Sequence, residues 1–215
     1  MTATSPDHRQ TRSMFRKLAI LDAALTCFSE RGIVETSIGE ICKRSGSTVG
    51  SVYHLFANKS GVVAALYLDT LTQYQAAIVQ KLRTASNAKD GLVAIISAHI
   101  DWVENNPHHA LFLQQARYEP AVATHSGDIQ AMNRVFGLAI ATWVKPHIDT
   151  GQLRPMPTDI FISVLLGPVS EHTKGRLSGR QSASSKVAKK LLSESAWRAL
   201  GGDSEVDESN SGEFA

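Results

Sequence analysis

Residues 37–59 read SIGEICKRSGSTVGSVYHLFANK, and this stretch predicts two short helices joined by a tight turn. Ser37 and Glu40 have the S-x-x-E spacing of a capping box, which satisfies free backbone N–H groups at the start of a helix. Gly46 can adopt the left-handed conformation that ends this helix sharply. Thr48 is a suitable N-cap for the second helix. The stretch therefore predicts a helix-turn-helix arrangement.

The second helix is predicted from Val49 to about Leu55, and it has the size to enter the major groove of B-DNA. A helix of two turns is unstable alone, so Val52 and Phe56 are expected to hold it by packing. The residues that face outward then include small side chains, which allow close approach, and Tyr53 and His54, which can contact phosphate oxygens. The predicted DNA-contacting set is Arg12, Ser37, Thr48, Val49, Gly50, Ser51, Tyr53, His54 and Lys59.

Some of these basic residues have a second interpretation. Arg12 belongs to a group of four bases before or within the first helix (Arg9, Arg12, Arg16 and Lys17), which form either a solvated arm or contacts to phosphate or the minor groove. Lys59 begins a helix, where a positive charge opposes the macrodipole. Its side chain is therefore expected either to meet a phosphate or to be solvated.

Residues 18–66 resemble the DNA-binding domain of the tetracycline-repressor (TetR) family of transcription regulators. The resemblance is carried by ILDAAL-x-x-F-x-x-x-G, by T-S-I-x-x-I, and by S-G-x-T-x-G-S-V-Y-x-x-F-x-x-K. It implies an all-α protein of about nine helices with an N-terminal helix-turn-helix domain and a C-terminal domain for ligand binding and dimerisation. It also implies a homodimer that binds a palindromic operator and releases it when a small-molecule effector binds.

The apolar spacing along the chain agrees with an all-helical fold. Helices are predicted over about 11–31, 58–83, 88–105, 107–119, 128–149, 158–177 and 184–200, with a loop over 121–127 and a kink or end at Pro146. The predicted domains are 1–57 for DNA binding, 58–200 for ligand binding and dimerisation, and 201–215 as a disordered acidic tail. Helix 158–177 is apolar almost all round, which requires burial on two sides and favours pairing with a second subunit, together with 184–200.

The composition is that of an ordinary globular protein, with 43% hydrophobic and 20% charged residues and a net charge of +2. Residues 1–60 carry eight Lys and Arg against five Asp and Glu, whereas residues 201–215 carry five acidic residues and no basic one. The six bases between Lys174 and Lys190 are expected in a solvated loop. No targeting or membrane-spanning segment is evident, so we expect a cytoplasmic protein.

The two cysteines, Cys27 and Cys42, lie on predicted inward faces, so they are either small buried side chains or a redox pair. No C-x-x-C or H-E-x-x-H spacing indicates a metal site, and no P-loop, G-x-S-x-G or G-x-G-x-x-G motif indicates a cofactor or an enzyme.

Candidates for effector binding are aromatic or polar groups on otherwise apolar helices. Each of them has plain core or surface packing as its alternative. Arg117 could pair with an anionic effector or, more locally, with Glu119 or Asp101. The candidates are His99, Trp102, Phe112, Gln115, Arg117, Tyr118, Met132, Trp143 and His172.

The sequence thus favours a homodimeric, ligand-responsive transcription regulator, and a repressor within that class. Two other classes remain: an all-helical enzyme, and an all-helical interaction protein without sequence-specific DNA binding. The effector, the operator and the regulated genes are not encoded in these patterns.

Overall fold

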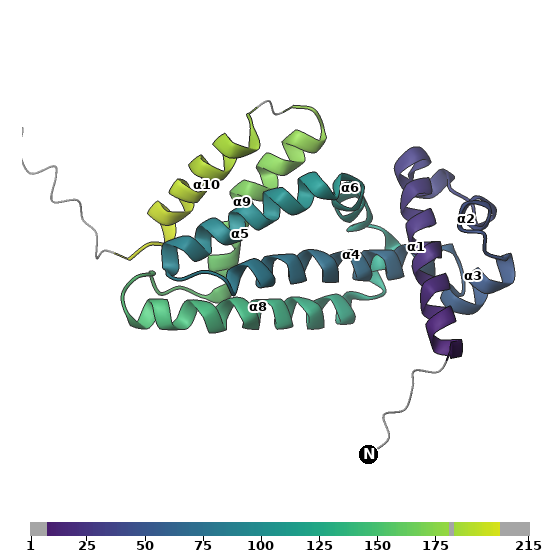
Figure 1. The fold of residues 1–215 in the computed structure, drawn as a ribbon, viewed down its shortest axis with the longest axis horizontal. Coiled ribbons are helices and arrows are strands. Elements are labelled where there is room, and N and C mark those ends of the chain that lie inside the picture. The colour runs from purple at the N-terminus through teal and green to yellow at the C-terminus, as the bar shows by residue number, and fades with distance from the viewer. Residues whose placement is uncertain (1–7, 181–182, 203–215) are drawn as a thin grey trace, which may run out of the picture. The chain divides into compact units, whose positions relative to one another are not determined.

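The computed structural model describes residues 8–180 and 183–202 of the chain (Figure 1). In this part of the chain every regular element is an α-helix, apart from an isolated bridge between Leu153 and Gly201. The predicted all-α class is confirmed. The helices are α1 (His8–Glu35), α2 (Ile38–Ser45), α3 (Val49–Phe56), α4 (Lys59–Leu82), α5 (Ala88–Asn105), α6 (Pro107–Ala116), α7 (Pro120–Ala123), α8 (Ser126–Asp149), α9 (Thr158–Leu177) and α10 (Ser185–Leu200).

The described residues form two compact units. The N-terminal unit contains the described residues up to Gln73 together with Asn106–Gln130, and the C-terminal unit contains Tyr74–Asn105 together with the described residues from Ala131 onward. Helices α4 and α8 therefore contribute to both units. The boundaries of the compact units differ from those of the predicted functional domains 1–57 and 58–200. The N-terminal unit also includes α6 and α7, because these helices pack with α1–α4.

The core of the N-terminal unit explains this membership. Ile20, Ile41 and Val52 of the first three helices are completely buried in one cluster, which also includes buried residues of α4 and α6. The Phe112 ring of α6 stacks on Phe28 of α1, with ring centroids 5.8 Å apart. Burying such large apolar surface is the main stabilising contribution in folding, so α6 completes the three-helix core.

Two local predictions need correction. The segment 121–127 is not a loop, because Pro120 occupies the first position of α7 and the Glu119 carbonyl accepts from the backbone N–H groups of Val122 and Ala123. Pro146 does not end α8, which continues to Asp149. A proline in the last turn removes a single hydrogen bond, so the helix tolerates it.

The predicted basic loop between Lys174 and Lys190 is also largely helical. Most of its described residues belong to α9 or α10, and two of its cations pair with α5: Arg176 with Glu104 at 2.9 Å, and Lys189 with Asp101. Residues 181–182 of this run, and residues 203–215 of the predicted acidic tail, lie outside the described residues.

Helix α5 is the central element of the C-terminal unit, next to α9 and α10 (Figure 1). Ten of its residues are buried, and Gly91 is among them. A Cβ atom at Gly91 would overlap the indole ring of Trp143 on α8. The glycine therefore allows α8 to approach α5 closely.

A polar chain links three helices inside this unit. The Tyr74 hydroxyl of α4 lies 2.7 Å from His99 Nδ1 of α5, and His99 Nε2 lies 2.9 Å from Thr173 Oγ1 of α9. The Thr173 hydroxyl donates to the Ser170 carbonyl, so its oxygen accepts from Nε2–H and Nδ1 accepts from Tyr74. His99 is therefore neutral, and burial lowers the pKa of His99 to about 4.

Replacing Gly91 with alanine should destabilise the C-terminal unit by about 1–3 kcal/mol, because the added methyl group must displace the Trp143 ring. Gly137 on α8 has open space around its Cβ position, so Gly137→Ala is the matched control. The control should stabilise the helix by about 0.5–1 kcal/mol. Urea unfolding followed by circular dichroism measures both, and equal effects of the two substitutions would contradict the close approach.

The neutral His99 predicts acid sensitivity. An unperturbed imidazole has a pKa of 6.5, whereas the pKa of His99 is about 4 in the folded protein. As the pH falls, the unfolded chain therefore binds the proton of this imidazole before the folded protein does. The free energy of unfolding is highest above pH 6.5 and decreases by about 3 kcal/mol as the pH falls to 4. Urea unfolding at pH 7 and pH 4.5 should show a smaller loss for His99→Gln than for the unsubstituted protein. Parallel losses in the two proteins would rule out His99 as the source.

Candidate nucleic-acid interface

Helix α3 is held at its start by the side chain of Thr48. The Thr48 oxygen accepts from the Ser51 backbone N–H at 3.2 Å and lies 2.9 Å from the Ser51 hydroxyl. Before it, Gly46 has a φ of 65° and ends α2 in the left-handed conformation. The predicted caps and turn are therefore confirmed, and they fix where α3 begins.

One face of α3 is buried and the other is open. Val52 and Phe56 are buried, while Val49 and Tyr53 are 50% and 52% exposed. Gly50 and His54 are also exposed, and Ser51 is half-buried. The five residues of α3 in the predicted DNA-contacting set, Val49, Gly50, Ser51, Tyr53 and His54, are thus all at least partly accessible.

This face borders a hollow of about 300 Å³ that α1 helps to form. The hollow is lined by hydroxyl, imidazole and guanidinium groups and by no carboxylate. A helix N-terminus adds a partial positive charge and free N–H groups. This combination suits the binding of a phosphate group. The lining residues are Ser13, Arg16, Thr48, Gly50, Ser51, His54 and Leu55.

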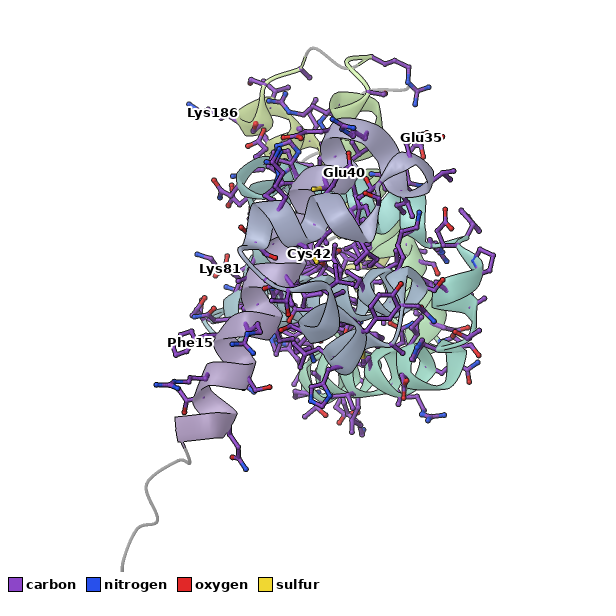
Figure 2. All side chains as sticks on the ribbon, turned by 90° about the vertical axis from the view of Figure 1, so that its right-hand side faces the viewer. Phe15, Glu35, Glu40, Cys42, Lys81 and Lys186 are labelled. Carbon is purple, nitrogen blue, oxygen red and sulfur yellow. The ribbon has the colours of Figure 1, made fainter. Side chains whose placement is uncertain are left out.

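The hollow favours Arg16 over Arg12 as the cation beside α3. Arg12 is exposed on α1 and is not among the lining residues, whereas Arg16, one turn further along, is. The sequence places both in one basic group and cannot rank them, because the rank depends on how α1 crosses α3. Phe15, on the same part of α1, projects outward (Figure 2) and is 68% exposed.

Ser37 and Lys59 have structural partners. Ser37 is the N-cap of α2: its backbone N–H donates to Glu40 Oε2 at 2.8 Å, and its side chain accepts from the Glu40 N–H at 3.3 Å. The backbone hydrogen bond from Ser37 is the main reason why the pKa of Glu40 is lowered. The Lys59 ammonium donates to backbone carbonyls of residues 33, 34 and 36. These carbonyls belong to the protein's own backbone, a partner that neither interpretation of Lys59 from the sequence includes.

A second hollow of the N-terminal unit contains compensated charges. It is lined by Cys27 and by charged residues of α1 and α2. Arg31 pairs with Glu40 at 2.6 Å, and Arg44 pairs with Glu30 at 2.7 Å.

Both cysteines are buried free thiols, and burial raises the pKa of Cys42. A raised thiol pKa disfavours the reactive thiolate, so the packing interpretation of the cysteines is favoured.

The candidates for effector binding are divided between the two compact units. Phe112, Gln115, Arg117 and Tyr118 belong to the N-terminal unit, and the other five belong to the C-terminal unit. Phe112 is a core residue stacked on Phe28. Gln115 and Arg117 are exposed, and Asp101, one of the two local partners suggested for Arg117, pairs with Lys189.

Most candidates of the C-terminal unit already have packing partners. Both ring nitrogens of His99 are hydrogen-bonded. The Trp102 ring meets the Tyr74 ring edge-on with centroids 5.1 Å apart, and the Trp143 and His147 ring centroids are 4.6 Å apart. His172 differs, because its Nε2 is buried without a hydrogen-bond partner. Met132 is half-buried.

A hollow of about 280 Å³ lies between the end of α8 and the start of α9. Its lining is mainly apolar, with the ion pair Lys145–Asp149 at 2.8 Å. None of the predicted effector residues lines it. Sequence reasoning missed it, because the i, i+3, i+4 spacing of its apolar residues is also that of ordinary core. The lining residues are Ala141, Val144, Lys145, Ile148, Asp149, Met156, Thr158 and Phe161.

Two features are absent from the described residues. No group of three or more His, Cys, Asp or Glu side chains in that part of the chain is placed to hold a metal ion. None of the helices described is both long enough and apolar enough to span a bilayer.

Comparison with known proteins identifies relatives of the helix-turn-helix region. Residues 20–66 match the family model for bacterial regulatory proteins of the tetR family. The chain is 25% identical over 97 residues to the fatty acid metabolism regulator protein of Bacillus subtilis, covering 45% of this chain and 50% of that protein. It is 30% identical over 88 residues to the HTH-type transcriptional regulator BetI of Cronobacter sakazakii, covering 40% and 44%. The matches thus span about half the length of these relatives.

Solved structures share the fold over most of the chain. A TetR family transcription regulator from Marinobacter aquaeolei superposes with a TM-score of 0.72 at 19% identity, covering 90% of this chain and 99% of that one. FadR from Bacillus subtilis, solved in complex with stearoyl-CoA, gives 0.72 at 17% identity over 83% and 96%. At such identities the likeness establishes the fold alone. The sequence match therefore assigns residues 20–66, which include the helix-turn-helix, to the tetR family of bacterial regulatory proteins.

Proposed function

We propose that this protein is a transcriptional repressor that binds a palindromic DNA operator as a homodimer and releases it when a small-molecule effector binds. The observation that carries the proposal is the open face of α3 beside Arg16. The family matched by residues 20–66 is one of regulatory proteins, which favours this proposal over the enzyme alternative.

The interface chemistry supports DNA as the partner. The exposed residues near the start of α3, which follow the N-cap Thr48, are small, so this end of the helix can approach base edges in a major groove. Arg16, Ser13 and the α3 N-terminus supply donors for phosphate oxygens, which fix register rather than sequence. A dimer would present two such helices to half-sites about one helical turn apart, or a multiple of it.

Exposed apolar residues on α9 and α10 support dimerisation. Phe161, Leu165 and Val169 of α9 are buried within the chain. Ile160 of α9 is 49% exposed, and Val187 and Leu191 of α10 are 47% and 56% exposed. Val187 and Leu191 are four residues apart and therefore share one face of α10. Packing of this face of α10 and of Ile160 against a second copy would give α9 the second buried side that its apolar sequence requires.

The apolar hollow at the α8–α9 junction supports an effector with an apolar part. Its aliphatic and aromatic lining suits a hydrocarbon group, and Lys145, which pairs with Asp149 in this structure, is a cation among the lining residues that could bind an anionic end. The stearoyl-CoA in the FadR structure makes acyl-CoA thioesters of graded chain length a rational first screen. Effector release of DNA requires that the effector binds the DNA-free arrangement more tightly.

DNA binding is tested by selecting a palindrome from a random duplex library and then measuring its Kd over a range of salt concentrations. Arg16→Ala should weaken binding to all duplexes and flatten the slope of log K against log salt by about 0.9 for each lost phosphate contact. Arg134→Ala, an exposed arginine of the C-terminal unit, is the control and should leave the slope unchanged. Failure of the unsubstituted protein to enrich any duplex at low salt would contradict the proposed function.

Dimerisation is tested by placing a charge on the proposed interface. Leu191→Glu should shift the protein from dimer to monomer in sedimentation velocity runs, because the carboxylate would have to be buried between subunits. Val135 on α8 is 71% exposed and lies outside the proposed interface, so Val135→Glu should leave the dimer intact. A dimer that withstands Leu191→Glu, or dissociates only with Val135→Glu, would place the interface elsewhere.

A further inference from the structure

The Lys59 ammonium, at the first residue of α4, lies against three backbone carbonyl oxygens of the segment between Gly32 and α2. Nζ donates to the carbonyl of Ile33 at 3.1 Å, of Val34 at 2.9 Å and of Thr36 at 3.0 Å. An ammonium group has three N–H donors and no acceptor. These three bonds therefore use its full donor capacity.

These carbonyls are exposed to Lys59 because α1 is interrupted at Gly32. Gly32 has φ 84° and ψ 162°, which is not helical. Carbonyls at a helix end lack intrahelical partners and carry the negative end of the macrodipole. Thr36, itself buried, donates its hydroxyl to the carbonyls of Cys27 at 3.2 Å and Gly32 at 2.8 Å. Thr36 and Lys59 together thus donate to the carbonyls of five residues between Cys27 and Thr36.

The same bonds join the two ends of the helix-turn-helix. Thr36 directly precedes Ser37, the N-cap of α2, while Lys59 follows Phe56, the last residue of α3, by three positions. Asn58 fixes Lys59 on the other side, because its Oδ1 accepts from the Gly61 N–H at 2.9 Å and caps α4. One side chain therefore ties the start of α2 to the chain that leaves α3.

We infer that Lys59 is a positioning residue for α3, which holds the helix-turn-helix closed through the carbonyls of residues 33, 34 and 36, and not a ligand of DNA phosphate. This inference rests on the DNA binding proposed above. A positive charge at the first turn of α4 is unfavourable for α4 itself. This cost is offset because the ammonium donates hydrogen bonds to carbonyls at the C-terminal end of α1 and at Thr36.

The first test needs no DNA. Hydrogen–deuterium exchange is compared for the full-length protein, for Lys59→Met and for Lys81→Met, which changes an exposed lysine near the other end of α4 (Figure 2). Lys59→Met should accelerate amide exchange in residues 33–41 and in α3, and Lys81→Met should not. Unchanged exchange in Lys59→Met overturns the inference.

The second test separates positioning from a phosphate contact. With the selected duplex, Lys59→Met should raise Kd about tenfold while leaving the salt slope unchanged. A slope that falls by about 0.9 for each protomer's lost contact would mean that Lys59 binds phosphate, and it would overturn the inference. An unchanged Kd would also overturn it. Lys59→Arg, which keeps a cationic donor, should restore most of the affinity.

Two further outcomes remain decisive. If Lys59→Met does not fold, acylation of the unsubstituted protein by an amine-reactive ester is followed by mass spectrometry. Lys59 should then react several-fold more slowly than Lys81, and equal reactivity overturns the inference. If the unsubstituted protein selects no duplex, the proposed function fails, whereas the exchange experiment still decides whether Lys59 holds α2 and α3 together.

Discussion

The break in α1 at Gly32 leaves backbone carbonyls between α1 and α2 without intrahelical donors. The arrangement of the helix-turn-helix depends on the side chains that donate to these carbonyls. Thr36 and Lys59 supply the donors, the first from the turn itself and the second from the far side of the helix-turn-helix. The capping box at Ser37 then starts α2. Backbone satisfaction thus fixes both ends of the α2–α3 pair, while Val52 and Phe56 fix which face of α3 is buried.

In the C-terminal unit the equivalent constraint is the close packing on α5. Gly91 admits the Trp143 ring, and His99 joins Tyr74 and Thr173 through a chain in which each donor has an acceptor. A fully satisfied buried network favours one arrangement of the helices over others. The same satisfaction removes His99 from the groups available to an effector. The apolar hollow at the α8–α9 junction lacks such a network and keeps open volume instead.

Helices α4 and α8 each contribute residues to both compact units. A change in the C-terminal unit that displaces α4 would act on Lys59 at its first turn, and through Lys59 on the carbonyls that precede α2. The residues that line the proposed effector hollow belong to α8, α9 and the segment between them, and α8 also contributes residues to the N-terminal unit. Coupling of effector binding to DNA release requires an element with two arrangements.

The sequence by itself determined the local features of this protein. Caps at Ser37 and Thr48, the stop at Gly46 and the apolar periodicity placed α2, α3, α5, α9 and α10 close to their observed bounds, because each signal acts within one or two turns of chain. The family motif at residues 20–66 is equally local. Only the tertiary structure decided the partners of Lys59 and His99, the choice of Arg16 over Arg12, and the inclusion of α6 in the N-terminal core. These depend on segments 23 or more residues apart in the chain, and no periodicity within one helix determines which side chain a distant helix will present to it.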